Sequence, residues 1–392
     1  MAKKPLQNVV VVAYGRSAVA KAGKKGALRA MHPVDMGGLV LKGVMDKLPA
    51  AVAHEVEDVI VGCALPEQTQ GLNPARLISA RAGMPHTACG LTVDRFCSSS
   101  LQAVALAAWQ IEAGQAECIV AGGIESMTAL PITVDRRPDW NPWLTEHDPD
   151  QYIGNGETAE NVAQRYGITR DMMDTLAAES HRRAAAAQDA GYFDEQIIPL
   201  PGLDEAGNEI IFNKDQGVRR DTSVEKLGAM KACFRENGLV TAATSSQVSD
   251  GAAFLVLMSR EKAAELNLNP IASFLGFAVA GLDPAYMGLG PIYAVPKVMD
   301  FVGLTVEDMD VIELNEAFAA QAIPCMKELG MDEKKVNPNG GAMALGHPLG
   351  ATGAILSCKA LAELSRTGGR YALVSMCIAG GMGAAGVFKA ED

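Results

Sequence analysis

The amino-acid sequence predicts an α/β fold with two similar halves, each built from a mixed or parallel sheet with helices on its faces. Three observations lead to this class. Short apolar runs alternate with helical patterns at both ends of the chain, which is typical of strands and helices that share one core. The order of elements in the first 123 residues recurs after residue 271. The segment between these two parts has a different composition.

The first half is expected over residues 1–123, with residues 247–270 completing it. Residues 8–13 are a continuous apolar run bounded by turn residues, as in a buried strand. Further strands are expected at 56–62, 91–94 and 118–123, and helices at 33–47, 73–82 and 98–113. Gly83 and Gly114 stand where the last two helices end, because glycine favours the backbone conformation that closes a helix.

The second half is expected over residues 271–392 and repeats the same order of elements. Its strands are expected at 271–279, 311–314, 370–377 and 383–387, and its helices at 292–302, 316–329 and 350–364. Residues 124–246 are expected to form an inserted loop domain. Within it, Pro, Trp, Asp and Arg are frequent between residues 130 and 150, and Ala-rich helices follow between 158 and 190.

The composition limits the class of protein and its partners. A net charge of −12 gives no general attraction to nucleic acids or to anionic membranes, so neither is expected as a partner. The pairs Arg136-Arg137 and Arg219-Arg220 are either a local contact for an anionic substrate or ordinary solvated surface. The 8 cysteines include no C-x-x-C pair, so no metal site is expected. Free thiols, with no signal-peptide pattern and no long apolar stretch, predict a cytoplasmic protein.

Cys97 is the first candidate for chemistry. It stands directly before Ser98, at the start of the helix expected at 98–113. Unpaired backbone N–H groups at a helix start would stabilise a thiolate and could bind an oxyanion. The alternative is a small buried apolar side chain at the start of a helix.

His347 is the only histidine embedded in glycines, within residues 340–350. Glycines allow the backbone to approach another segment closely, and Pro348 stiffens the residue before it. Such rigidity suits a base that must stay within hydrogen-bond reach of a thiol. The alternative is a histidine that only occupies a turn.

Cys377 and Asn315 each follow a predicted strand. Beyond Cys377, the Gly-Gly-Met-Gly turn at 380–383 is followed by Ala-Ala-Gly-Val-Phe, whereas a dinucleotide-binding loop would lead into a long helix. Asn315 either caps the next helix or faces a ligand crevice at the carboxyl end of its strand. Two thiols and one histidine in such a setting point to acyl transfer through a cysteine thioester.

Four segments resemble the active-site blocks of the thiolases. They are Cys97-Ser98-Ser99, Asn315-Glu316-Ala317-Phe318, Gly346-His347-Pro348 and Cys377-Ile378-Ala379-Gly380-Gly381. The resemblance covers nearly the whole chain in order, including residues 125–127, 158–162, 249–253 and 287–291. It implies a thiolase-like fold, in which two halves with mixed sheets pack around buried helices. It also implies that the inserted loop domain binds coenzyme A.

The resemblance also implies a role for each residue of these blocks. Cys97 is the nucleophile, and His347 activates it and lines an oxyanion hole in which Asn315 holds a water. Cys377 is the acid and base at the α-carbon of acetyl-CoA. A second oxyanion hole uses the backbone N–H groups of Cys97 and Ala379. The residues expected to contact coenzyme A or the acyl chain are Ser246, Arg219, Met287 and Phe318. No cofactor is expected to be bound permanently, and coenzyme A serves as a co-substrate.

The sequence departs from the family pattern at residues 154–156. Gly154-Asn155-Gly156 stands where short-chain biosynthetic thiolases often have His-Met-Gly. This difference predicts a roomier acyl pocket and hence a degradative 3-ketoacyl-CoA thiolase of fatty-acid β-oxidation. One alternative is an acetoacetyl-CoA (biosynthetic) thiolase that condenses two acetyl-CoA. An alternative of another class is a non-catalytic acyl-CoA-binding protein. The resemblance further predicts a homodimer or homotetramer, and allows association with an enoyl-CoA hydratase/3-hydroxyacyl-CoA dehydrogenase.

Overall fold

The computed structural model describes residues 5–131 and 137–391. Arg136, from one of the arginine pairs considered above, lies outside these residues. A sheet of 10 strands runs through the protein in the order β10-β11-β12-β9-β1-β8-β5-β3-β4, and the short strand β2 pairs with β8. Across the described residues, no helix combines the length and the apolar composition needed to cross a bilayer. The prediction of an α/β protein with mixed strand directions is confirmed.

The N-terminal part of the sheet begins with β1, whose residues are all buried. Its strands are β1 (Val9–Arg16), β2 (Ala20–Lys21), β3 (Asp58–Gly62), β4 (Leu91–Val93), β5 (Cys118–Ser126) and β8 (Ser249–Ser259). Its helices are α1 (Pro33–Met45), α2 (Val52–Glu55), α3 (Pro74–Arg81), α4 (Ser99–Glu112) and α9 (Arg260–Glu265). Strand β8 lies between β1 and β5, so residues far along the chain complete this part of the sheet.

The C-terminal part contains the strands β9 (Ala272–Gly281), β10 (Val311–Leu314), β11 (Tyr371–Ile378) and β12 (Met382–Ala390). Its helices are α10 (Gly290–Val302), α11 (Ala319–Glu328), α12 (Ala342–Leu345) and α13 (Thr352–Thr367). Residues 127–248 contain α5 (Pro142–His147), α6 (Asn155–Tyr166), α7 (Arg170–Asp189) and α8 (Val224–Gly228), and the hairpin of β6 (Leu200–Leu203) with β7 (Glu209–Phe212). The predicted domain boundaries at 123 and 246 stay a prediction.

The two parts of the sheet repeat one pairing pattern. In the first, β1 is antiparallel to β8, β8 is antiparallel to β5, and β5 is parallel to β3. In the second, β9 is antiparallel to β12, β12 is antiparallel to β11, and β11 is parallel to β10. Antiparallel pairing of β1 with β9 joins the two parts into one sheet. The pairing confirms the prediction of two similar halves.

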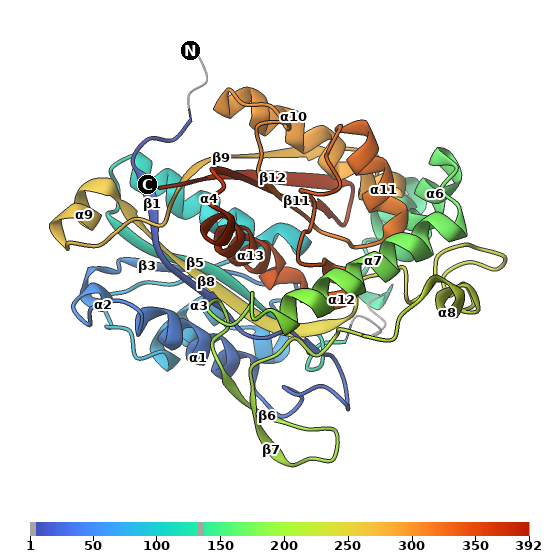
Figure 1. Cartoon of the computed structure of the whole chain (residues 1–392). Helices are drawn as coiled ribbons and strands as arrows, with labels where there is room; N and C mark the ends of the chain where they lie inside the picture. Colours follow the sequence, from blue (N-terminus) through green and yellow to red (C-terminus); the bar gives the residue numbers. More distant parts are fainter. Residues whose placement is uncertain (1–4, 132–136, 392) are drawn as a thin grey trace.

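Two buried helices fill the space between these halves. Figure 1 shows α4 and α13 side by side at the centre, and they contact each other and both parts of the sheet. Alanines such as Ala103, Ala107 and Ala108 leave α4 narrow enough to be enclosed. On the outer faces, α1 packs on β1 and β8, and α10 packs on β9 and β12. Cys97 comes just before α4 and His347 comes just before α13, so the buried helices place both residues near the centre.

One helix boundary differs clearly from the prediction. The helix expected at 316–329 begins only at Ala319, because Phe318 has an extended backbone with φ −146° and ψ 144°. Residues 315–318 instead run beside 244–246, where Ser246 donates its N–H to the Ala317 carbonyl at 2.8 Å. Phe318 is therefore the residue before the helix, and the alternative in which Asn315 caps this helix is wrong.

Candidate active site

Cys97 lies in a tight turn between β4 and α4. The turn is the single-turn 3-10 helix η2 (Phe96–Ser98), and Phe96 has a left-handed backbone with φ +44°. This conformation is unfavourable for a residue with a side chain, so the surroundings must hold it. The Asp94 carboxylate accepts the Phe96 N–H at 2.7 Å, and the Ser99 hydroxyl donates to the Phe96 carbonyl at 2.7 Å. The turn therefore fixes the position of the Cys97 sulfur.

The Cys97 thiol is protonated at rest. Its side chain is buried, and burial raises its pKa to about 12. Hydrogen bonds from the backbone N–H groups of Ala379 and of Cys97 itself act in the opposite direction and are weaker. The backbone N–H of Cys97, just before α4, therefore favours the thiolate, as expected, but removal from water outweighs it and the net shift of the pKa is upward. The two N–H groups that face the sulfur are those predicted to form an oxyanion hole.

Cys377 lies on β11, close to Cys97. Burial raises the pKa of Cys377 well above its usual value, and the neighbouring Cys97 and Cys325 raise it further. Cys377 pairs with Gly383 across the β11–β12 hairpin. Gly380 and Gly381, with φ of 76° and 78°, close this hairpin. The glycine-rich turn thus joins two strands, which excludes the dinucleotide-binding alternative and places the Ala379 N–H against Cys97.

His347 is a neutral imidazole held through both ring nitrogens. Nδ1 lies 2.6 Å from the Thr352 hydroxyl oxygen, and when that hydroxyl donates to the Pro348 carbonyl at 3.1 Å, Nδ1 carries the ring proton. Nε2 is left with its lone pair, which faces the Asn315 side-chain amide at 3.4 Å. Burial lowers the pKa of His347 to about 4. A neutral ring whose Nε2 lone pair has only this long contact has the form required of a general base.

Asn315 retains one free acceptor. Its Oδ1 atom is buried and has no hydrogen-bond partner among the described residues. A buried amide oxygen of this kind is suited to a bound water or a substrate group. The turn with Cys97 also contacts β11 and the residues after His347, Leu349–Ala351. The structure therefore brings Cys97 beside Cys377 and Ala379, and brings Asn315 beside His347.

The four residues predicted to contact coenzyme A or the acyl chain lie in three different settings. Met287 and Phe318 are buried in the same apolar cluster as Cys377. Ser246 is partly buried beside Ala317, through the backbone hydrogen bond described above. Arg219 is exposed, and its backbone N–H donates to Nδ1 of His181 at 3.1 Å. Their contacts with substrate stay predictions.

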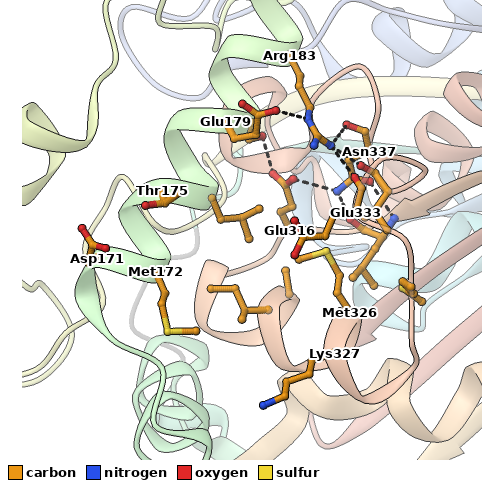
Figure 2. Close-up of a pocket in the computed structure, with 17 residues that line it drawn as sticks. Asp171, Met172, Thr175, Glu179, Arg183, Glu316, Met326, Lys327, Glu333 and Asn337 are labelled. Carbon is orange, nitrogen blue, oxygen red and sulfur yellow. Dashed lines mark hydrogen bonds and ion pairs between the residues drawn. The ribbon is translucent and has the colours of Figure 1, made fainter.

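A cavity of about 620 Å³ lies between α7 and α11, away from the two thiols. Figure 2 shows that Asp171, Met172 and Glu179 of α7 face Met326 and Lys327 of α11 across it. Its lining reaches Glu316 but includes none of Cys97, His347 and Cys377. In the described part of the chain, no group of three or more His, Cys, Asp or Glu side chains could hold a metal ion.

Sequence reasoning missed three residues that shape the site. Thr352 contacts Nδ1 of His347, and Cys325 adds to the raised pKa of Cys377. Glu125 is fully buried on β5, and its charge contributes to the raised pKa of Cys97. Only Glu125 had a visible signal, because a carboxylate inside the apolar run that forms β5 must be paired.

The protonated state of Cys97 predicts a pH dependence for its alkylation. The rate of modification of Cys97 by iodoacetamide should rise about tenfold per pH unit between about pH 7 and 9, because the thiolate fraction rises in that proportion below the pKa. Mass spectrometry would assign the labelled cysteine, with a Cys97→Ala variant as the background. A rate that is already level at pH 7 would contradict a protonated thiol at rest.

Comparison with known families agrees with this arrangement. The family description "Thiolase, N-terminal domain" matches residues 9–261, and "Thiolase, C-terminal domain" matches residues 268–390. The chain belongs to the thiolase family. It is a thiolase, an acyltransferase that acts on acyl-CoA substrates.

Similar proteins carry different names, of which 3-ketoacyl-CoA thiolase and acetyl-CoA acetyltransferase are two. A relative from Bacillus subtilis called 3-ketoacyl-CoA thiolase is 44% identical and covers 98% of this chain and 100% of its own length. An acetyl-CoA acetyltransferase from Allochromatium vinosum is 40% identical, and the alignment covers 97% of this chain and 98% of that protein. The crystal structure of the Bacillus anthracis acetyl-CoA acetyltransferase aligns with a TM-score of 0.89 at 40% identity, covering 99% of this chain and 100% of that one.

Proposed function

We propose that this thiolase is a 3-ketoacyl-CoA thiolase, which uses coenzyme A to cleave a 3-ketoacyl-CoA into acetyl-CoA and a shortened acyl-CoA. The observation that carries the proposal is the meeting of two buried thiols, Cys97 and Cys377, at a turn that also contacts the residues just after His347. One thiol can form a bond to carbon, and the other can move a proton. No permanently bound cofactor is required.

The first half-reaction transfers the acyl group to Cys97. His347 Nε2 takes the thiol proton while the sulfur attacks the 3-keto carbon. The bond between C2 and C3 then breaks, so the acyl group stays on Cys97 and the electron pair stays on C2 of acetyl-CoA. The Cys377 thiol protonates C2 and becomes a thiolate. Acetyl-CoA leaves, and protonated His347 remains.

The second half-reaction restores the enzyme. The Cys377 thiolate takes the proton from the thiol of coenzyme A, and the resulting sulfur anion attacks the thioester carbonyl. The shortened acyl-CoA leaves, and Cys97 recovers its proton from His347. The order of events is ping-pong, because acetyl-CoA departs before coenzyme A reacts.

Two sets of donors are proposed to stabilise the oxyanions. The backbone N–H groups of Cys97 and Ala379 already contact the Cys97 sulfur, so an oxygen on the attached acyl carbon falls within their reach. His347 and a water held by Asn315 are proposed to form the other set. The free Oδ1 of Asn315 supports this assignment, since it can accept a hydrogen bond from that water.

The degradative subtype is supported by residues 154–156 at the start of α6. The support lies in the sequence, which lacks the His and Met of the short-chain biosynthetic pattern at these positions, while in the structure Gly154 and Asn155 are exposed. The name of the Bacillus subtilis relative agrees with this subtype. The acetoacetyl-CoA thiolase alternative shares the mechanism and is supported by the acetyl-CoA acetyltransferase relatives. The non-catalytic alternative is disfavoured, because the family is one of enzymes.

A chain-length profile tests the subtype. Thiolysis of 3-ketooctanoyl-CoA is expected to match or exceed that of acetoacetyl-CoA in kcat/KM. If residues 154 and 155 border the acyl chain of a bound substrate, the value for 3-ketooctanoyl-CoA should fall by about tenfold in a Gly154→His/Asn155→Met variant, because steric differences in an apolar pocket are of that order. The value for acetoacetyl-CoA should change little.

Gly154→Ser, which adds only a small side chain, serves as the matched control, and its kcat/KM for 3-ketooctanoyl-CoA should stay unchanged. 3-Ketohexadecanoyl-CoA extends the profile to long chains. A strong preference of the unmodified enzyme for acetoacetyl-CoA would establish the biosynthetic alternative instead.

We also propose a homodimer or homotetramer in the cytoplasm. Strand β4 is at the edge of the sheet, and Leu72 beside it is 91% exposed, which favours contact with a second copy. Sedimentation would distinguish such an assembly from a monomer of 41.1 kDa. Association with an enoyl-CoA hydratase/3-hydroxyacyl-CoA dehydrogenase would suit an enzyme that consumes the product of a hydroxyacyl-CoA dehydrogenase, and copurification would test it.

A further inference from the structure

The segment that carries His347 is held at both ends by buried carboxylates. We call residues 340–352 the His347 segment. Near one end it contacts Glu316, which follows β10, and near the other it contacts Glu125 of β5. Glu125 lies on a strand of the N-terminal part of the sheet, and Glu316 follows a strand of the C-terminal part. Neither is among the residues to which the proposed reaction assigns a role.

Glu316 accepts three hydrogen bonds. Its Oε2 accepts the Met343 N–H at 3.2 Å and the Ser180 hydroxyl proton at 2.7 Å, and its Oε1 accepts from the Asn337 amide at 2.9 Å. Figure 2 shows Glu316 pointing towards Asn337 behind the α7–α11 cavity. The Ser180 oxygen in turn accepts the Gly341 N–H at 3.0 Å. The carboxylate thus ties α7 to the first residues of the His347 segment.

Glu125 makes the matching contacts at the other end. Its Oε2 accepts the Gly350 N–H at 2.8 Å and the Ala64 N–H at 2.9 Å. Its Oε1 accepts from the Gln70 side-chain amide at 2.7 Å. Gln70 is oriented by its own oxygen, which accepts the Ser126 N–H at 2.6 Å. A buried carboxylate is costly unless its oxygens are paired in this way.

Between the two ends, the backbone of the segment lies close to its neighbours. His347 donates its N–H to the Gln247 carbonyl at 3.0 Å and to the Ser249 hydroxyl oxygen at 3.2 Å. A side chain at Gly346 would overlap Ser249, and one at Gly341 would overlap the Glu316 carboxylate. These close approaches show that the segment is fitted to its supports and has little freedom to move.

We propose that Glu125 and Glu316 are positioning residues that together fix the His347 segment, and thereby hold the His347 ring in the place from which it acts as the base, with Nε2 beside Asn315. The inference rests on the proposed role of His347 as the base. Each carboxylate acts through backbone N–H groups and touches no reacting atom. Because both act on one short segment, loss of either should release His347.

The test replaces each carboxylate with its isosteric amide. In Glu125→Gln and Glu316→Gln, the new NH2 group must face an N–H donor in either orientation. In one orientation that donor is the N–H of the segment itself, and in the other it is the side-chain amide of Gln70 or Asn337, so each variant loses one contact that holds the carboxylate against the segment. We expect kcat to fall between about 10- and 100-fold, the effect of a small misplacement of a catalytic group, while KM for coenzyme A changes by less than about threefold. Concentrations refer to folded enzyme, measured by circular dichroism and thermal unfolding.

Three further measurements separate positioning from other effects. Glu112→Gln is the matched control, because Glu112 accepts the backbone N–H groups of Gln7 at 3.1 Å and Asn8 at 2.9 Å, away from the site. Its kcat should stay unchanged. The double variant Glu125→Gln/Glu316→Gln should lose less than the product of the two single losses, because both act on the same segment. Iodoacetamide should alkylate Cys97 of Glu125→Gln at least as fast as in the unmodified enzyme, since a nearby negative charge is gone.

The outcomes distinguish failure of this inference from failure of the proposed function. If His347→Ala slows acylation of Cys97 but both Gln variants keep an unchanged kcat, the positioning role is wrong. Multiplicative losses in the double variant would also overturn it. If His347→Ala acylates normally, the proposed base is wrong. If a Gln variant does not fold, Ser180→Ala can be tested instead, because Ser180 joins Glu316 to the Gly341 end of the His347 segment. A fall in kcat of about fivefold would support the proposal, and an unchanged kcat would reject it.

Discussion

Replacing Cys97 with alanine is expected to abolish acyl-enzyme formation and to lower thiolysis by about 10⁴-fold or more, the scale seen when a nucleophile is removed. No other thiol of the described residues is placed to accept the acyl group in this site. Cys377 faces the same site, but the N–H groups of Ala379 and of the η2 turn are directed at the Cys97 sulfur. An acyl group on any other sulfur would lack those donors.

Mass spectrometry after incubation with acetyl-CoA provides the measurement. The unmodified enzyme should gain one acetyl group, and peptide mapping should place it on Cys97. Cys118→Ala is the matched control, because Cys118 is equally buried but belongs to β5 and its apolar core. This control should acetylate normally. Acetylation of the Cys97→Ala variant at another cysteine would refute the assignment of the nucleophile.

Replacing Cys377 with alanine should separate the two chemical steps. Acetyl transfer from acetyl-CoA to Cys97 expels the sulfur anion of coenzyme A, which is stable without a carbon acid, so acetylation should survive. Cleavage of a 3-ketoacyl-CoA expels a carbanion that must be protonated, so turnover should fall by about 10³-fold, within the range for loss of a general acid. Burial keeps the Cys377 thiol protonated and therefore able to supply this proton.

Exchange of the methyl protons of acetyl-CoA in D2O isolates the proton transfer. The unmodified enzyme should exchange them, and Cys377→Ala should not, even while its Cys97 is acetylated. Cys325→Ala is the control, since Cys325 is the third buried thiol of this region and has no assigned proton to move. Near-normal exchange or thiolysis by Cys377→Ala would show that another group is the acid.

Much of the fold follows from local patterns in the sequence. The run at 311–314 is strand β10 with the same bounds, because three of its four residues are apolar and the fourth, Glu313, is buried in an ion pair with Lys359. The blocks around Cys97, Asn315, His347 and Cys377 have the residue types that their chemistry requires. Family matches over 9–261 and 268–390 agree with these blocks.

What the sequence could not provide depends on contacts between distant segments. Residues 315–318 have a helical pattern, yet they are not helical and Phe318 is extended, because the backbone of 317–319 hydrogen-bonds with residues 244–246. The state of the Cys97 thiol depends on how completely α4, β11 and the turn at Ala379 enclose it, and local sequence at a helix start predicts the opposite shift. The partners of Glu125 come from residues 64, 70 and 350, and no sequence spacing indicates them.

The pairing of β1 has a consequence for the order in which the protein can be completed during synthesis. β1 leaves the ribosome first, yet its neighbours are β8, where Val9 pairs with Ser259, and β9, where Val10 pairs with Ser273. The strand at the centre of the sheet therefore waits, apolar and unpaired, until more than half of the chain has been made. Contacts between such distant residues slow folding and leave strand edges open to aggregation in the meantime. The nascent chain is thus most vulnerable before the middle of the sheet can close.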